Sequence, residues 1–216
     1  MDEAGTAFDA ERPPTAATAA DALAIIEGQQ ARTAAQLRPN SVLLYALWGT
    51  VWLVIGVLYF AVAAAGLAEA AAGWSTTGLV IAGMVISLVA GVRSSRGVRG
   101  ASTVQGALWG LGWTIAMIGV GVLLGGVARL GASGPLLAVL SPAVFVFVVG
   151  VLYLVTGAVW TSRTEYVLGV WTIVVALASV YVALPGSPLV IGLGGGGGLL
   201  AAALVHSGQA RARRPR

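Results

Sequence analysis

The segment LVIGLGGGGGLLAAALVH, residues 189–206, contains a spacing that binds phosphate in many nucleotide-binding proteins. Gly192 to Gly197 match the pattern G-x-G-x-x-G, in which glycines let the backbone approach a pyrophosphate. A dinucleotide site also needs a preceding strand in a soluble fold and an acidic residue about 20 residues further on. Here the glycines lie in a long apolar run, and none of the residues after Gly198 is acidic. The pattern therefore does not indicate a nucleotide site.

Ser133 and His206 are the next candidate pair, because a serine nucleophile and a histidine base within the membrane could cleave peptide bonds. Such a pair must lie within hydrogen-bond reach. His206 follows Pro188 by a helix length of about 27 Å, which places it on the face of the membrane opposite Ser133. Glu69 and Glu165 are single loop acids, expected to be solvated or paired with nearby Arg, and the chain has no cysteine. We expect no enzymatic activity, no cofactor and no metal site.

The composition predicts a membrane protein. Of the 216 residues, 58% are apolar and 9% are charged, whereas a soluble domain carries about 25% charged residues. Several apolar runs are long enough to cross a hydrocarbon core of about 30 Å as a helix. We expect an all-α, polytopic protein with a membrane domain over residues 42–206. Its six transmembrane helices are predicted near residues 42–66, 76–92, 104–127, 136–159, 165–184 and 188–206.

The arginines predict the orientation of these spans, because the cytoplasmic flanks of membrane helices carry the basic excess. With the N-terminus inside, eleven of the twelve arginines lie on the cytoplasmic side and Arg129 alone lies outside. Both termini are therefore expected in the cytoplasm of a bacterial cell, and the spans in its cytoplasmic membrane. Anionic lipid headgroups are the expected partners of the basic tail over residues 207–216, rather than nucleic acid.

The segment before the first span divides into two parts. Residues 1–20 are rich in Ala, Thr, Pro and acids and are predicted to be disordered. Residues 21–38 predict a mildly amphipathic helix that ends before Pro39. Its apolar face includes Leu23, Ile26 and Leu37. The favoured role is an interfacial helix resting on lipid headgroups or on the protein's own loops. The alternative is a docking site for a soluble partner.

Short tryptophan motifs recur in the odd-numbered spans. ALWGTVW at residues 46–52 returns as ALWGLGW at 107–113, and LGVWTIV at 168–174 resembles GWTIAMI at 112–118. The chain could thus consist of three tandem helical hairpins in one orientation, a form of repeat found in transporters. The alternative is that tryptophan recurs because aromatic residues gather at membrane interfaces.

The run DALAIIEGQQARTAAQLRPNSVLLYALWGTVW, residues 21–52, resembles the start of a group of uncharacterised six-span membrane proteins of high-GC Gram-positive bacteria, some loosely labelled as transporters. The resemblance is carried by Glu27-x-Gln29-x-x-Arg32-Thr33, Pro39, Leu44-Tyr45 and Trp48-Gly49-x-x-Trp52. It implies a membrane protein and no particular activity.

A peptide group that faces lipid without a hydrogen bond costs several kcal/mol, so the glycine run must be helical or buried against protein. Two arrangements satisfy this condition. In the favoured one, small-xxx-small faces let another helix approach closely, with the glycines of span three as a partner. In the other, span six breaks near the midplane and its free carbonyls line a cavity, while Pro142 interrupts span four at a comparable depth. The candidate residues for packing or for a substrate pathway are Thr114, Pro142, Gly192, Gly194, Gly195, Gly196, Gly197 and Gly198.

Two functions remain open, and neither is enzymatic. The first, which the sequence favours, is a permease-like or transport-associated subunit, with a small-solute pathway through spans three, four and six. It would work as a homo-oligomer or with another membrane or ATPase subunit. The second is a structural or regulatory membrane protein that organises partners through its N-terminal helix and its glycine-rich faces. No charged residue lies in the interior of a span, which disfavours ion-coupled transport. A cavity walled by Pro142 and the glycines would favour the first function, and a closed glycine-packed bundle the second.

Overall fold

The computed structural model describes residues 20–25, 28, 41–95 and 101–212. The chain divides into two units, Met1–Arg38 and Pro39–Arg216. In the first unit the described residues are helical, and Leu23 is exposed. The predicted docking residues Ile26 and Leu37 lie outside the described residues, as does nearly all of the predicted disordered tail.

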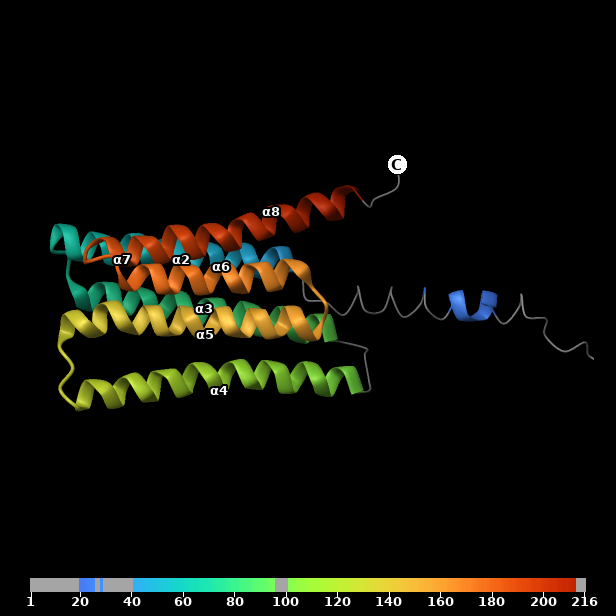
Figure 1. Cartoon of the computed structure of the whole chain (residues 1–216), viewed down its shortest axis with the longest axis horizontal. Helices are drawn as coiled ribbons and strands as arrows, with labels where there is room; N and C mark the ends of the chain where they lie inside the picture. Colours follow the sequence, from blue (N-terminus) through green and yellow to red (C-terminus); the bar gives the residue numbers. More distant parts are fainter. Residues whose placement is uncertain (1–19, 26–27, 29–40, 96–100, 213–216) are drawn as a thin grey trace, which may run out of the picture. The chain divides into compact units, whose positions relative to one another are not determined.

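Six apolar helical spans make up the second unit (Figure 1), and each is long and apolar enough to cross a membrane. No strand occurs in the described part of the chain. The predicted all-α, six-span fold is therefore confirmed. The first five spans are α2 (Ser41–Ala65), α3 (Glu69–Ser95), α4 (Ala101–Arg129), α5 (Gly134–Val159) and α6 (Arg163–Val180). The sixth consists of α7 (Gly186–Leu189), the π-helical segment η1 (Val190–Gly196) and α8 (Gly197–Ala212).

Three span boundaries differ from the prediction by four residues or more, one of them the end of the sixth span, whose helix continues to Ala212 instead of ending near residue 206. Helix α3 begins at Glu69 instead of near residue 76, because the alanines that follow Glu69 are strong helix formers and an acid in the first turn is favourable beside the helix dipole. Helix α6 ends at Val180 instead of near residue 184. Pro185 restricts the residue before it to non-helical conformations, which ends the span early.

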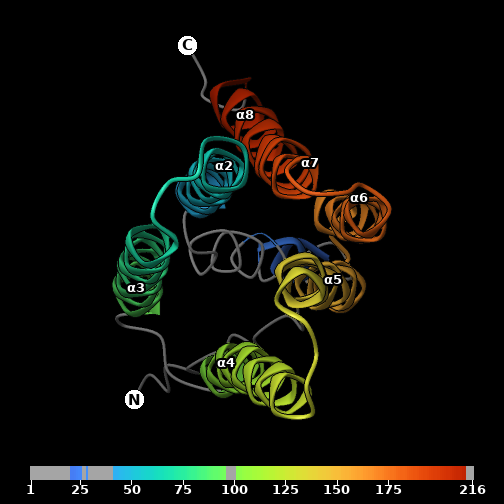
Figure 2. The ribbon, with the colours of Figure 1, turned by 90° about the vertical axis from the view of Figure 1, so that its left-hand side faces the viewer.

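The helices of the second unit pack side by side in the order α3, α2, the sixth span, α6, α5 and α4. Helix α2 contacts α8, η1 and α7, and the most extensive contact is between α5 and α6. Helix α3 packs mainly on α2, and α4 mainly on α5. Figure 2 looks along the helices and shows α3 and α4 at the two ends of this curved row. The sixth span thus lies at the centre of the packing, and α3 and α4 lie at its periphery.

A tryptophan of each odd-numbered span contacts the even-numbered span that follows it. Trp48 of α2 donates its indole N–H to the Ser87 hydroxyl of α3 at 3.0 Å. Trp109 of α4 meets the ring of Trp160, which follows α5, at a centroid distance of 5.1 Å. Trp171 of α6 reaches the sixth span. Each hairpin therefore has a tryptophan contact between its two spans, but the three tryptophans are not equivalent in the repeat, because Trp171 aligns with Trp113.

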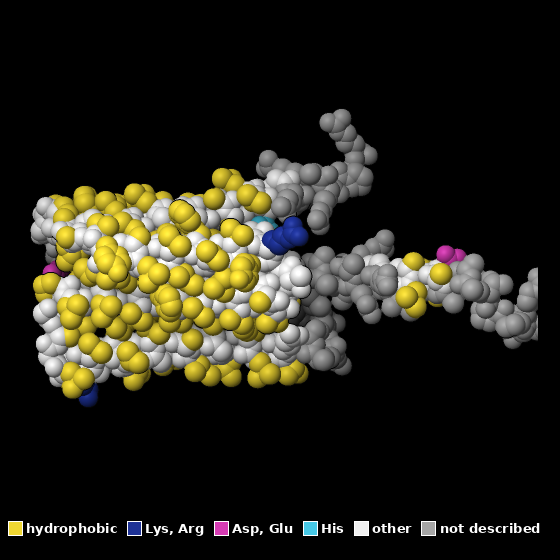
Figure 3. Space-filling view, in the orientation of Figure 1, with side chains coloured by type: hydrophobic (Ala, Val, Ile, Leu, Met, Phe, Trp, Pro, Cys, Tyr) yellow, Lys and Arg dark blue, Asp and Glu magenta, His cyan; other side chains and the backbone are white. Residues whose placement is uncertain are grey.

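Charged side chains lie at the ends of the helices. Figure 3 shows hydrophobic side chains over the length of the visible face and charged side chains at its two ends. Arg93 of α3 and Arg163 of α6 lie at the end where α2 begins and α8 ends, which we call the arginine end. Glu69 and Arg129 lie at the opposite end.

Candidate functional site: the glycine run and the arginine end

The glycine run brings the backbone of the sixth span against the backbone of α2. A Cβ atom added at Gly192 would lie 2.9 Å from the Cα of Gly56, and one at Gly196 would lie 2.7 Å from the carbonyl oxygen of Gly49. Both distances are shorter than real Cβ contacts. Only glycine fits at these positions, because the neighbouring atoms belong to backbone and cannot rotate away. The small-xxx-small face predicted from the spacing is therefore present.

The partner of this face differs from the prediction, which placed it in span three. Helix α4 does not pack against the sixth span, and a Cβ at Gly106, Gly110 or Gly125 would meet nothing within 4 Å. Gly121 only touches the ring of Phe145, at 3.9 Å. The partner is α2, which contributes the two glycines Gly49 and Gly56 seven residues apart.

Three of the other four glycines of the run face bulky side chains. A Cβ at Gly194 would lie 3.0 Å from Val175, one at Gly195 would lie 2.7 Å from the Trp52 ring, and one at Gly198 would lie 2.6 Å from the Trp171 ring. Gly197 alone among them has open space, with nothing within 4 Å. At five of the six glycines, the missing side chain thus makes room for a neighbouring helix. At Gly197 it leaves open space on the surface of the bundle.

The π-helical turn of η1 is stabilised by a side chain from α6. A π-helix shifts the backbone ladder from i−4 to i−5 and is rare outside single turns. The Trp171 indole N–H donates to the Gly194 carbonyl oxygen at 2.9 Å. The span stays helical from Gly186 to Ala212, so it is irregular but unbroken. The structure corresponds to the packing alternative.

Replacing Trp171 with Phe should destabilise the protein by about 1 kcal/mol. The ring would still pack on Gly198, but the Gly194 carbonyl would lose its indole donor on the apolar outer surface of the bundle. Interhelical hydrogen bonds in membrane proteins contribute about 0.6–2 kcal/mol. The measurement is unfolding in detergent, with Trp74→Phe on the exposed surface of α3 as the control. Equal stability of the two variants would contradict this role of the indole.

Pro142 and Thr114, the two other candidate residues, lie within continuous helices. Helix α5 runs without interruption through Pro142, so the interruption expected in span four is absent. The Thr114 hydroxyl, exposed on α4, donates to its own helix at the Gly110 carbonyl, 3.1 Å away. Hydroxyls in membrane helices commonly bond in this way.

A polar and aromatic cluster lies at the arginine end. The Tyr45 hydroxyl of α2 donates to Glu165 Oε1 of α6 at 3.3 Å. The Tyr45 ring also meets the rings of Tyr153 on α5 and His206 on α8, at centroid distances of 6.2 and 5.4 Å. Four helices therefore meet at Tyr45, which is buried.

This cluster changes the expected environment of two residues. Glu165 is half-buried in the first turn of α6 and bonded to Tyr45, rather than being a solvated loop acid. His206 contacts Tyr45 at the arginine end, whereas Ser133 precedes α5 at the other end. Ser133 and Tyr153 alone are separated by about 30 Å of helix. Ser133 and His206 therefore form no catalytic pair.

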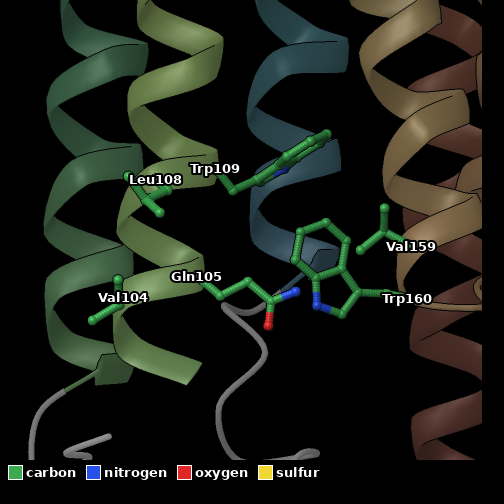
Figure 4. A pocket seen from close by; sticks show the side chains of 6 residues that line it. All are labelled: Val104, Gln105, Leu108, Trp109, Val159 and Trp160. Carbon is green, nitrogen blue, oxygen red and sulfur yellow. The ribbon is translucent and has the colours of Figure 1, made fainter. Parts of the chain in front are cut away.

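A pocket of about 420 Å³ lies between α4 and the end of α5 (Figure 4). The Gln105 side chain extends toward Trp160, and the two tryptophans meet edge to face above it. None of the described residues that line this pocket is ionisable, and together they offer an apolar surface with one amide. Its lining residues are Val104, Gln105, Leu108, Trp109, Val159 and Trp160.

The six apolar spans define the class of the protein: it is an integral, multi-pass membrane protein. No family model, curated protein or solved structure matches the chain. The resemblance of residues 21–52 to six-span proteins of high-GC Gram-positive bacteria stays a prediction.

Proposed function

We propose that the protein is a structural or regulatory subunit of the bacterial cytoplasmic membrane, without transport or enzymatic activity, that binds a transmembrane helix of another membrane protein through α4. The observation that carries this proposal is a contrast between two glycine-rich helices. In the sixth span, five of the six glycines between residues 192 and 198 have close neighbours from other helices, whereas the glycines of α4 have almost none.

Helix α4 carries two glycine faces. Gly106 and Gly110 recur at a spacing of four residues, as do Gly121 and Gly125, and at 100° per residue all four fall on one side. A second side carries Gly112, Gly119 and Gly126, spaced by seven residues. Glycine costs a helix up to about 1 kcal/mol relative to Ala in water. A partner helix that approaches the backbone would use these positions, because small residues are what membrane helix interfaces select.

The peripheral helices α3 and α4 leave most of their surface free for such a partner. Only 6% of the most apolar window of α3 and of α4 is buried within the chain, against 39% for the sixth span. The N-terminal helix would add a second contact on the cytoplasmic side, where Leu23 is exposed. The orientation with both termini inside is part of the proposal and rests on the arginine distribution.

A permease-like subunit is the weaker alternative. It needs a cavity walled by Pro142 and the glycine run, but those glycines pack on the backbone of α2 and on side chains of α2 and α6, and α5 is continuous at Pro142. The closed packing of this region supports a scaffold more than a solute pathway.

The test is co-purification from the native membrane in mild detergent, followed by mass spectrometry. We expect a stoichiometric membrane partner whose recovery falls about tenfold, or ~1.4 kcal/mol, in either Gly106→Leu/Gly110→Leu or Gly112→Leu/Gly119→Leu. Each pair of substitutions places side chains on one face of α4 where the protein itself leaves open space, so the thermal stability of the isolated protein should not change.

Gly208→Leu is the matched control, because Gly208 of α8 also has nothing within 4 Å. This variant should retain the partner. Recovery of the wild-type protein alone, or recovery of the partner at the wild-type level in both α4 double variants, would contradict the proposal.

A further inference from the structure

A groove of about 650 Å³ runs along the outer surface between α6 and the sixth span. The groove is deep along the sixth span because its floor is formed by residues without side chains, Gly194, Gly197 and Gly198. The Trp171 indole forms part of the wall and holds the Gly194 carbonyl. The glycine run therefore has a second consequence besides its contact with α2: it hollows the opposite surface of the same helix.

The groove has the length of one membrane leaflet. On the sixth span its lining extends from Val205, near the arginine end, to Leu193. Twelve residues of helix span about 18 Å, close to half of a hydrocarbon core that is about 30 Å thick. A transmembrane helix would need a groove about twice as long. A single acyl chain entering from the arginine end fits this length.

The polar residues of the groove lie at one end only. Arg163 and Thr164, the first two residues of α6, line it at the arginine end, and the rest of the lining is apolar. Arg163 is exposed and forms no ion pair with any described residue. A guanidinium group matches phosphate oxygens in charge and geometry, and basic pockets between membrane helices bind lipid headgroups.

We propose that the groove between α6 and the sixth span is a binding site for one anionic phospholipid, with an acyl chain along Gly197, Gly198 and Ala201 and the phosphate on the Arg163 guanidinium. The charge at one end and the apolar, leaflet-length remainder distinguish this ligand from a peptide or a second helix. The site does not depend on the partner proposed for α4.

The site can be tested by native mass spectrometry of the full chain, delipidated and then titrated with phosphatidylglycerol or phosphatidylcholine in mixed micelles. We expect one retained phosphatidylglycerol per chain at concentrations where phosphatidylcholine is not retained. Arg163→Gln should weaken phosphatidylglycerol binding roughly fivefold, the upper range for an exposed ion pair. Gly197→Leu should abolish retention, because the new side chain fills the groove.

Matched controls separate the site from general lipid coating. Arg93→Gln removes a charge at the same end, and Gly112→Leu adds the same side chain at an open position of α4. Both should bind as the wild type does. Ala201→Leu is a second groove-filling variant, in case Gly197→Leu does not fold. Equal retention of the two lipids, or binding unchanged by Arg163→Gln or by the groove-filling variants, would overturn the proposal.

Discussion

Gly196→Ala should destabilise the protein by about 3 kcal/mol, although it adds a single methyl group. The new Cβ would lie 2.7 Å from the Gly49 carbonyl oxygen and 2.9 Å from the Leu53 amide nitrogen. Both atoms belong to the backbone of α2, so a change of rotamer cannot relieve the contact and the two helices must separate. Overpacking of a well-packed interior costs about 1–3 kcal/mol, and we expect the upper end here.

The neighbouring residue provides the control. Gly197→Ala places the same methyl group one position further along, where nothing lies within 4 Å. Because Ala is the better helix former, this variant should be neutral or slightly more stable. The comparison is reversible unfolding in mixed micelles. Equal stability of the two variants would show that the sixth span does not pack on α2 as described.

Gly169→Ala should have the next largest effect, because it separates the two helices with the most extensive contact. Its Cβ would lie 2.6 Å from the Leu154 amide nitrogen and 2.8 Å from the Gly150 carbonyl oxygen of α5. We again expect a loss of about 3 kcal/mol of unfolding free energy. The measurement is thermal unfolding in detergent, and the melting temperature should fall.

Gly119→Ala on α4 is the control for this interface. Gly119 is exposed and has nothing within 4 Å. Like Gly169, it lies in the interior of a membrane-spanning helix, so an intrinsic effect of replacing glycine would be shared by both variants. A melting temperature for Gly169→Ala that matches the control would contradict the close approach of α5 and α6.

The spans could be predicted from the sequence because each depends on local information. Continuous apolar runs give their number, and Gly, Pro and Arg mark the connections. The small-xxx-small character of the glycine run also followed from spacing alone. Its partner did not, because Gly49 and Gly56 lie seven residues apart and α4 offers a more conspicuous glycine pattern. Which helices approach each other depends on the packing order of the whole bundle.

The cluster around Tyr45 was missed for a related reason. Tyr45 and Glu165 are separated by 120 residues, and each looks unremarkable within its own segment. Glu165 was expected in a loop, but it lies in the first turn of α6, where the order of packing brings it to α2. The π-helical turn was also not predictable, because it depends on how closely α2 approaches and on the Trp171 donor.

The most direct test of a closed, glycine-packed bundle uses the absence of cysteine from the chain. Single-cysteine variants Val146→Cys and Ile191→Cys probe two core positions that are 5% and 8% exposed, and Leu130→Cys probes a position that is 89% exposed. Each variant would be treated in membrane vesicles of both orientations with a maleimide that cannot cross the membrane. A packed core predicts labelling at residue 130 in one orientation and none at residues 146 and 191 in either. Labelling of a folded protein at residue 146 or 191 would reveal a water-filled pathway and contradict the scaffold account.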